Sequence, residues 1–385
     1  MVWTQVGLDG SLQARAVVAG DCPAISLNGQ DSTMAVRSGP TADSFADTVC
    51  EAAIPAGISE ASVGRQPLAL LPETVDRVAV VGDPGCRVSH WEAIQDCDDP
   101  ADWPLRAIAA EIAESAPHLV VHVGDYIYRE TPCPPGEASC AGSPFGDNQA
   151  TWQADFFDPM SRLLPVAPWL FLRGNHESCS REGVGWFRYF DPRPMPAACE
   201  RFTAPYAVDL AGLPRLVVMD TAEAGDSETT PELNAAYAEQ LASLERLATP
   251  GSWLLTHKPV AGGILYLDGK EQVVTNETFS AVSNNHLPAT LNLALAGHIH
   301  LAEVLLFDPG ASRPTQLIAG HGGTELDQGV SGAYDGAFLG EPALKAGLVV
   351  AAFGWMEVAV APDRITATAL GVEGRELFVV HLARE

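Results

Sequence analysis

Basic residues are scarce in this chain. Its 385 residues include 22 Lys and Arg against 49 Asp and Glu, which gives a formal net charge of -27. A field of this sign repels polyanions, so we expect neither a nucleic acid nor an anionic membrane surface as a partner. An anionic substrate would therefore need a strong local positive charge, which a metal cluster supplies.

Long apolar runs are absent as well. No stretch reaches the roughly 18 apolar residues that a membrane-spanning helix needs, so we expect no membrane span. Hydrophobic residues still make up 47% of the chain and charged residues only 18%, which is typical of a packed globular protein. The N-terminus, MVWTQVGLDGSLQ, lacks the basic and apolar regions of a signal peptide, and we expect that a leader was removed.

The chain also lacks the C-x-x-C spacing of zinc ribbons and thioredoxin-like redox sites. Its eight cysteines instead lie in close sequential pairs: Cys22, Cys50, Cys86, Cys97, Cys133, Cys140, Cys179 and Cys199. An even number in this arrangement favours a disulfide framework. Many connectivities are open, and we expect nearest neighbours in the sequence to pair. Disulfides form in oxidising compartments, so we expect an extracytoplasmic location, either periplasmic or secreted.

Two patterns divide the chain. Residues 1–75 contain short alternating stretches such as LQARAVV, broken by Gly, Pro, Asn and Asp, which predict a small β-sandwich-like domain. Over residues 76–385, apolar strand-like runs alternate with amphipathic segments, including a helix across Leu105 to Ile112 and another that opens at Pro231. This alternation predicts a layered α/β domain. We expect the strand-like segments after His300 to complete the same sheets.

Five polar motifs follow strand-like runs. They are VVGDPG with Asp83, HVGDYIY with Asp125 and Tyr128, LRGNHE with Asn175 and His176, LLTHKP with His257, and LAGHIH with His298 and His300. Ligand crevices of open α/β sheets lie beyond the carboxyl ends of strands, so we expect these residues to meet. Taken singly, each motif has an ordinary explanation, such as a turn or a buried histidine. Their joint occurrence in this order favours a functional site.

The side-chain types in these motifs suit metal ions. Carboxylate, imidazole, amide and phenolate donors together fit a hard trivalent cation beside a borderline divalent one. A shared aspartate can hold two cations at the separation of roughly 3.5 to 4 Å found in two-metal hydrolases. His298 and His300 are two residues apart, so in an extended segment their side chains leave on the same face.

With these five motifs, the sequence resembles the calcineurin-like metallophosphoesterases, and among them the purple acid phosphatases. The family pattern is an aspartate motif, GD-x-x-[D/N/Y], GNH-[D/E], a lone histidine and GH-x-H, and the chain carries all five between Asp83 and His300. Most of the superfamily has D-x-H as the first motif, whereas this chain has Gly85 at the histidine position. Purple acid phosphatases lose the same histidine and gain a tyrosine, which GDYIY supplies as Tyr128.

The resemblance implies a four-layer α/β/β/α metallophosphoesterase sandwich, preceded by a small all-β domain. It also implies two metal ions per chain, with Asp125 as the bridging ligand. The ligands of the first ion, Fe(III), would be Asp83, Tyr128 and His300. The ligands of the second ion, which would be Fe(II), Zn or Mn, would be Asn175, His257 and His298.

The same resemblance implies hydrolysis of phosphomonoesters. A metal-bound hydroxide would attack phosphorus in line with the leaving alcohol, and His176 would protonate or hydrogen-bond the leaving oxygen, with Glu177 either orienting it or serving the structure. Phosphodiester or phosphotriester hydrolysis on the same site is the nearest alternative, and a non-catalytic binding protein is a more distant one. Candidates for contact with the substrate are Arg87, Arg173 and His321, with Arg129, Lys258 and His286 as further possibilities. We expect Tyr126 and His122 to pack in the core.

Overall fold

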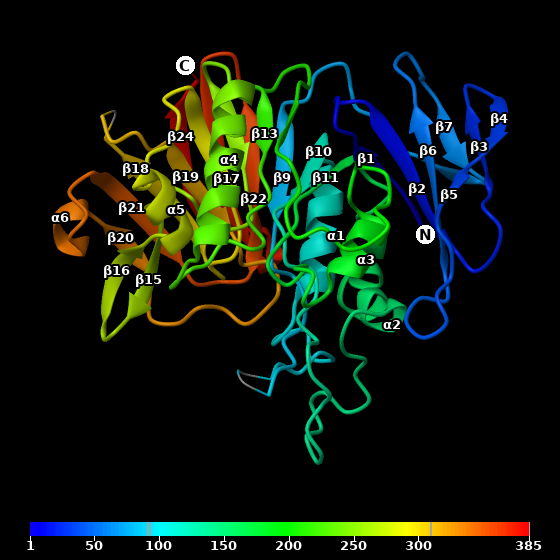
Figure 1. The fold of residues 1–385 in the computed structure, drawn as a ribbon, viewed down its shortest axis with the longest axis horizontal. Coiled ribbons are helices and arrows are strands. Elements are labelled where there is room, and N and C mark those ends of the chain that lie inside the picture. The colour runs from blue at the N-terminus through cyan, green and yellow to red at the C-terminus, as the bar shows by residue number, and fades with distance from the viewer. Residues whose placement is uncertain (91, 93, 309, 385) are drawn as a thin grey trace.

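Two large β-sheets form the body of the molecule (Figure 1). The computed structural model describes residues 1–90, 92, 94–308 and 310–384. The first sheet has ten strands, which in spatial order are β24 (Arg375–Ala383), β23 (Arg364–Gly371), β22 (Gly354–Val360), β9 (Arg77–Val81), β10 (Leu119–His122), β11 (Trp169–Phe171), β1 (Val2–Val6), β2 (Leu12–Val18), β6 (Thr48–Ile54) and β5 (Ala35–Ser38).

The second large sheet has eight strands. In spatial order they are β12 (Tyr206–Val208), β13 (Leu216–Val218), β14 (Ser252–Leu255), β17 (Leu291–Ala296), β19 (Thr315–Ala319), β18 (Ala302–Phe307), β21 (Leu344–Val350) and β20 (Gly332–Tyr334). Two small sheets complete the strands of the described residues. They are the hairpin of β15 (Gly263–Leu267) and β16 (Lys270–Val274), and a sheet of β4 (Gln30–Thr33), β3 (Ala24–Leu27), β7 (Ala61–Val63) and β8 (Gln66–Pro67).

Alternation along the strands separates the layers. In β9, Val78 and Val80 enter the core between the two large sheets, whereas Val81 faces the outer side. In β14, Trp253 enters the same central core, and Leu254 faces outward. Because successive side chains of a strand point to opposite faces, each sheet presents one apolar face to the other sheet and one to a layer of helices.

Helices cover both outer faces. The helices are α1 (Leu105–Ser115), α2 (Gln149–Trp152), α3 (Gly183–Tyr189), α4 (Pro231–Leu247), α5 (Glu277–Ser283) and α6 (Gly336–Leu339), with a π-helix at Gln153–Phe157 and 3₁₀ turns at Pro159–Arg162 and Val372–Gly374. Ile108 of α1 packs in the cluster that contains Val81, and Tyr237 of α4 packs with Leu254. The layers are therefore α/β/β/α, which confirms the predicted fold class.

Both predicted helices are present. Helix α4 begins at Pro231 because the hydroxyl of Thr230 accepts a hydrogen bond from the backbone N–H of Leu233 and proline needs no partner at the first helical position. Strands β18 and β19 enter the second sheet and β22, β23 and β24 enter the first. The segments after His300 thus complete existing sheets, as predicted.

The strands of residues 1–75 divide between two sheets. Strand β1 pairs in parallel with β11, with Gln5 opposite Trp169, and β2, β6 and β5 extend the same ten-stranded sheet. Strands β4, β3, β7 and β8 form the small sheet, and Ile25 of β3 and Ala14 of β2 belong to one buried cluster. Residues 1–75 thus contribute strands to two sheets that share a core, and one of these sheets continues into β11. A domain boundary at residue 75 stays a prediction. In Figure 1 the blue strand β1 lies beside β11.

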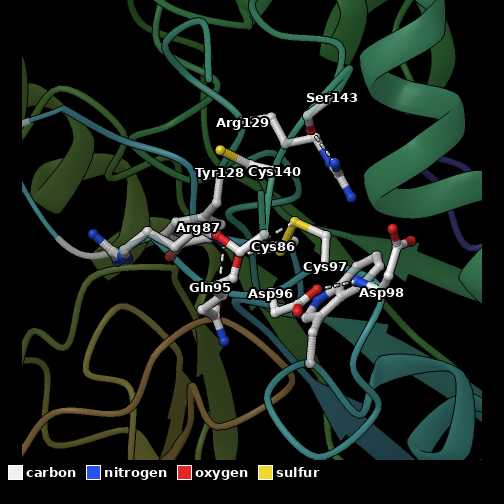
Figure 2. Close-up of a disulfide and its surroundings, with 12 residues drawn as sticks. Cys86, Arg87, Gln95, Asp96, Cys97, Asp98, Tyr128, Arg129, Cys140 and Ser143 are labelled. Carbon is white, nitrogen blue, oxygen red and sulfur yellow. Dashed lines mark hydrogen bonds between the residues drawn. A yellow bond between two sulfur atoms is a disulfide. The ribbon is translucent and has the colours of Figure 1, made fainter. Parts of the chain in front are cut away.

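Four disulfides brace the loops. They join Cys22 to Cys50, Cys86 to Cys97, Cys133 to Cys140 and Cys179 to Cys199, which confirms the predicted nearest-neighbour pairing. The bond from Cys86 closes the loop that follows β9 (Figure 2). Within the described part of the chain, none of the helices combines the length and the apolar character that a membrane crossing requires.

Candidate metal centre

Parallel strands deliver the predicted site residues to one place. Neighbours β9, β10 and β11 of the first sheet run parallel and lead into Asp83, Asp125 and Asn175. In the second sheet, β14 and β17 also run parallel and lead into His257 and His298. The carboxyl ends of both sheets therefore supply side chains to a common centre.

Three of these residues have strained backbones. Asp83, Asp125 and His298 have φ angles of 54°, 53° and 70°, in the left-handed region that residues with a Cβ rarely adopt. Such conformations each cost of order 1 to 3 kcal/mol and persist where the surroundings enforce them, often at functional sites. Here the sharp turns directly after the strands aim the side chains into the space between the sheets.

A first group of donors gathers around the phenol of Tyr128. Its Oη lies 2.9 Å from Oδ1 of Asp83, 3.1 Å from Oδ2 of Asp125 and 2.9 Å from Nε2 of His300. Tyr128, Asp83 and Asp125 are all buried. The two predicted aspartates, the tyrosine and one histidine thus share a single pocket.

A second group gathers around His257. Its Nε2 lies 3.1 Å from Oδ2 of Asp125 and 3.0 Å from Oδ1 of Asn175. One donor atom from each of Asp125, His257 and His298 lies within 4.8 Å of the others, which is close enough for a shared metal ion. Asp125 belongs to both groups, so the geometry matches the expectation that it lies between two cations.

Backbone carbonyls fix the orientation of two histidines. Nδ1 of His257 lies 2.8 Å from the carbonyl oxygen of Val123, and Nδ1 of His300 lies 2.9 Å from that of Glu325. A carbonyl only accepts hydrogen bonds, so Nδ1 carries the proton in both rings. Each Nε2 is then a free lone pair that faces the centre, which is the arrangement typical of metal-ligating histidines.

The burial of the Asp83 and Asp125 carboxylates also favours bound cations. Burial, followed by the nearby Asp125 carboxylate, raises the pKa of Asp83 well above its ordinary value. Burial acts in the same direction on Asp125, but its interactions with His176 and His257 hold its pKa well below the ordinary value. Buried carboxylates are stable when they are paired or when they coordinate metals. The donor set therefore fits two metal ions, with Asp125 between them.

His176 lies beside both groups without belonging to either. Its backbone N–H donates to Oδ1 of Asp125 at 2.8 Å, and its ring centroid lies 4.0 Å from that of Tyr128. Nδ1 lies 2.7 Å from the carbonyl oxygen of Ile127, which accepts its proton. Nε2 lies 2.9 Å from Nη2 of Arg181 and 3.7 Å from Oδ2 of Asp125.

Gly85 explains the departure from D-x-H. A Cβ atom at this position would lie 2.7 Å from the carbonyl oxygen of Tyr126 and 2.9 Å from Cδ2 of Tyr128. Both distances are below the closest approach that real Cβ atoms show. The backbone nitrogen of Tyr128 would lie 2.8 Å away as well, so the two closest contacts are to backbone atoms. Any side chain at position 85 therefore requires this backbone to shift, and glycine is the residue that fits.

Two buried carboxylates that sequence reasoning assigned incompletely or missed hold the loops in place. Glu177 accepts the backbone N–H groups of Asp125, Tyr126 and Gly174 at 3.0, 2.7 and 3.0 Å, so of its two predicted roles the structural one is present. Asp155, which no motif singled out, accepts the backbone N–H of Tyr128 at 2.9 Å.

Asp226 is a further acidic residue that the motifs missed. Its Oδ1 lies 3.3 Å from Nε2 of His298, and its Oδ2 accepts a hydrogen bond from Nζ of Lys258 at 2.5 Å. Burial acts to raise the pKa of Asp226, but the hydrogen bond to His298 and the charge of Lys258 together hold it below its ordinary value. Its only sequence signal is its place in the loop that follows β13.

Arg87 lies next to the candidate metal ligands. Its guanidinium carbon lies 4.9 Å from the ring centroid of Tyr128, and the side chain pairs with Glu92. Figure 2 shows Arg87 and Tyr128 close to the disulfide of Cys86 and Cys97. Arg87 is thus the predicted substrate contact whose position suits that role.

Arg173 and His321 do not suit that role, which corrects the prediction for both. The guanidinium of Arg173 is buried and donates to the carbonyl oxygens of Glu177 and Glu200, each at 2.8 Å. His321 is fully buried, and that burial lowers its pKa to about 4. Adjacency to a motif brought both residues near the centre, but their side chains face the protein interior.

The further candidates also have other partners. Arg129 forms an ion pair with Asp155 at 2.5 Å, Lys258 is paired with Asp226, and His286 is exposed. The predicted packing residues behave as expected. Tyr126 and His122 are fully buried and stack with ring centroids 3.9 Å apart.

Comparisons with known proteins agree with this geometry. Residues 76–302 match the family model described as calcineurin-like phosphoesterase. Among solved structures, the purple acid phosphatase PPD1 from yellow lupin (Lupinus luteus) seeds shares 13% identity and superposes with a TM-score of 0.59, covering 100% of this chain and 74% of the lupin chain. The structure of PhoD shares 11% identity with a TM-score of 0.58, covering 100% of this chain and 88% of its own. No curated protein matches the chain by sequence.

Proposed function

The chain belongs to the calcineurin-like phosphoesterase family, and on that premise we propose that it is a binuclear, purple acid phosphatase-like enzyme that hydrolyses phosphate monoesters. One observation carries this proposal. Asp125 lies between two groups of donor atoms, one centred on Tyr128 and the other on His257. A phenol in the first group distinguishes this centre from one built on a D-x-H motif.

We assign the two metal ions by donor chemistry. Asp83, Tyr128 and His300, with Asp125, would hold Fe(III), because hard oxygen donors including a phenolate suit a trivalent cation. Asn175, His257 and His298, with Asp125, would hold a divalent Fe, Zn or Mn ion. Two such cations polarise phosphoryl oxygens and activate water as a nucleophile. Their charge also lets a chain of net charge -27 attract a phosphate ester.

His176 is the proposed catalytic acid. Because the carbonyl of Ile127 holds the proton of Nδ1, protonation of the ring places the second proton on Nε2. Nη2 of Arg181 lies 2.9 Å from Nε2 and can only donate, so the proposal requires this guanidinium to move aside when the ring is protonated. From Nε2, His176 can then hydrogen-bond or protonate the oxygen of the leaving alcohol. The backbone N–H of His176 meanwhile holds Oδ1 of Asp125, so one residue orients the bridging carboxylate and supplies the proton.

We also propose an extracytoplasmic location. Four disulfides within one chain favour an oxidising compartment, and each closes a loop of 28 residues or fewer. Small phosphate esters are the expected partners.

The first test is the visible absorption spectrum of the concentrated, as-purified protein, with metal analysis of the same sample. We expect two metal ions per chain, one of them iron, and a broad visible band from a tyrosinate bound to Fe(III). Replacing Tyr128 by Phe should abolish the band. Tyr126→Phe is the matched control, because Tyr126 is equally buried two residues away and its hydroxyl donates to the carbonyl of Leu172.

A colourless protein with two Zn or Mn ions would refute the tyrosinate–iron assignment. Activity is tested separately with aryl phosphate mono-, di- and triesters. Faster turnover of the monoester is expected, whereas a preference for the diester or triester would replace the proposed substrate class with the alternative one.

A further inference from the structure

A cleft opens directly beside the candidate metal ligands. It has a volume of about 460 Å³ and is lined in part by His298 and His300, one from each group of donors. Strands β15 and β16 form another part of its lining, with Leu265, Leu267 and Val274. An ester held by its phosphoryl group at the centre would extend its organic part into this space.

The register of the hairpin explains this lining. In β15 and β16, Gly263 pairs with Val274 and Leu265 pairs with Gln272. Because side chains alternate, Leu265, Leu267 and Val274 share one face of the hairpin, and Ile264 and Val273 share the other. Ile264 of the second face is buried in a cluster of the second sheet, and Leu265 and Val274 also pack partly against this cluster. The side chains of the first face that line the cleft are Leu265, Leu267, Gln272 and Val274.

Strand β15, GILYL, is apolar along its length, whereas β16, KEQVV, begins with three polar residues. Continuous apolar sequence is typical of strands that are covered on both sides, whereas a strand with one solvated side alternates with polar residues. Leu267 of β15 is nevertheless 44% exposed. Strand β15 thus presents an apolar side chain that the chain itself does not cover, at the edge of the proposed centre.

The carboxylates that line the cleft have no basic side chain among them. Asp226 and Asp327 line it, and among the described residues no Lys or Arg side chain does. Lys270 is paired with Leu267 at the end of the hairpin, outside this lining. The nearby Lys258 is already paired with Asp226. An organic group that carries a negative charge would meet two carboxylates there without a cation of its own, apart from the metal ions that hold the phosphoryl group.

We propose that this cleft binds the alcohol part of the substrate and selects an uncharged, apolar group, such as an aryl or branched alkyl group. The inference rests on the proposed function and specifies the substrate class of the same site. Esters whose organic part carries carboxylate or further phosphate groups are disfavoured. The hairpin face made by Leu265, Leu267 and Val274 supplies the contact area, and Asp226 and Asp327 supply the discrimination against anions.

Binding of phosphonates, which are not hydrolysed, tests this inference directly. Calorimetry on the as-purified protein would compare methylphosphonate, 2-naphthylphosphonate and a carboxylated naphthylphosphonate. We expect the uncharged naphthyl compound to bind at least about tenfold more tightly than the methyl compound, from the apolar area that it buries. The carboxylated compound should lose most of that gain.

A matched pair of variants locates the effect. Leu267→Ser should weaken binding of 2-naphthylphosphonate about fivefold and leave methylphosphonate unchanged, because only the longer ligand reaches the hairpin. Leu8→Ser, at an exposed leucine that does not line the cleft, should change neither affinity. Equal affinity for all three phosphonates, or no effect of Leu267→Ser, would overturn the inference.

Turnover of 4-nitrophenyl phosphate, measured in parallel, separates this inference from the proposed function. If the protein hydrolyses the ester but binds the naphthyl compound no more tightly than the methyl compound, the proposed phosphatase function stands and the proposed selectivity of the cleft is refuted. If the protein hydrolyses no ester but binds the naphthyl compound more tightly, and Leu267→Ser removes this difference, the selectivity of the cleft is supported and the phosphatase function is refuted.

Discussion

The two sides of the proposed metal centre are built differently. The side formed by the first sheet is closed: Asp83, Asp125 and Tyr128 are at most 1% exposed, and His176 is 7% exposed. The side formed by the second sheet and its loops is open, since the side chain of Asp226 is 50% exposed and Leu267 is 44% exposed. Backbone donors and two disulfides hold the closed side, whereas the open side carries a hairpin with an uncovered apolar side chain.

This difference indicates that the two sides of the centre have different functions. The closed side fixes charges and proton positions, which a reaction at phosphorus needs to within a fraction of an ångström. The open side has to admit substrates, so it tolerates exposure and uses contact area instead of fixed hydrogen bonds. Changes on the closed side should therefore alter the chemical step most, and changes on the open side should alter affinity.

The strongest test of this division is His176→Ala on the closed side. Loss of a positioned acid typically lowers turnover about 10² to 10⁴-fold. We expect the loss in kcat to be largest for esters with poor leaving groups, which need the proton most, and metal content to stay unchanged. Steady-state kinetics over a series of aryl and alkyl phosphates, with metal analysis, measures both.

His381→Ala, at an exposed histidine of β24, is the control and should leave kcat unchanged. Equal losses for good and poor leaving groups would assign His176 to binding or structure instead of proton transfer.

A smaller effect is expected for Asp226→Asn on the open side. The carboxylate adds negative charge beside His298, so its loss should weaken retention of the second metal ion about 10 to 100-fold, as changes around metal ligands commonly do. Metal content during titration with a chelator measures this, with no need for activity. The iron at the Tyr128 site should be retained.

Asp209→Asn provides the comparison, because Asp209 also pairs with a basic side chain, Arg215, but lies in no group of candidate ligands. If the Asp226→Asn variant lost both metal ions together, metal retention on the closed side would depend on the open side, which contradicts the proposed division.

The smallest effect concerns Glu303, which anchors the hairpin. It is fully buried and accepts the backbone N–H of Ile264 at 2.9 Å, and burial raises its pKa well above the ordinary value of 4.5. A group whose pKa is raised in the folded state favours folding in full below its unfolded pKa, and this contribution is lost as pH rises towards the folded pKa. Glu303→Gln should therefore stabilise the protein by about 1 kcal/mol at pH 8 and have little effect at pH 4.

Denaturant unfolding at the two pH values measures this difference. Glu357→Gln in β22, where the glutamate is only partly buried, is the control and should change stability at pH 8 by less than Glu303→Gln does. Destabilisation by Glu303→Gln at both pH values would mean that Glu303 is held as a carboxylate by its surroundings.

Sequence reasoning identified the site residues that follow strands on both sides of the centre and missed the loop contacts of the open side, for a physical reason. Asp83, Asp125, Asn175, His257 and His298 follow strands directly, so the parallel sheets determine where they meet, and strand patterns are visible in the sequence. The contacts of Asp226 with His298 and of Glu303 with the hairpin depend on how loops fold back in space. No local pattern encodes that approach.

The same limit explains two other differences. The alternation in residues 2–18 predicted strands correctly, but it does not identify the partner strand, and β1 pairs with β11, which lies far along the chain. Arg173 is adjacent to the GNHE motif, yet its side chain points to the carbonyls of Glu177 and Glu200. Position in the chain predicts where a backbone passes but not the direction of a long side chain.

The close fit of Gly85 against the backbone has a consequence for how such centres change over time. A Cβ at position 85 would lie 2.7 Å from the carbonyl oxygen of Tyr126 and 2.8 Å from the backbone nitrogen of Tyr128. Exchanging the side chain of Tyr128 leaves both contacts in place. A histidine at position 85 therefore requires the loop after β10 to take another path, so side-chain exchange alone does not convert the tyrosine form of the centre into the histidine form.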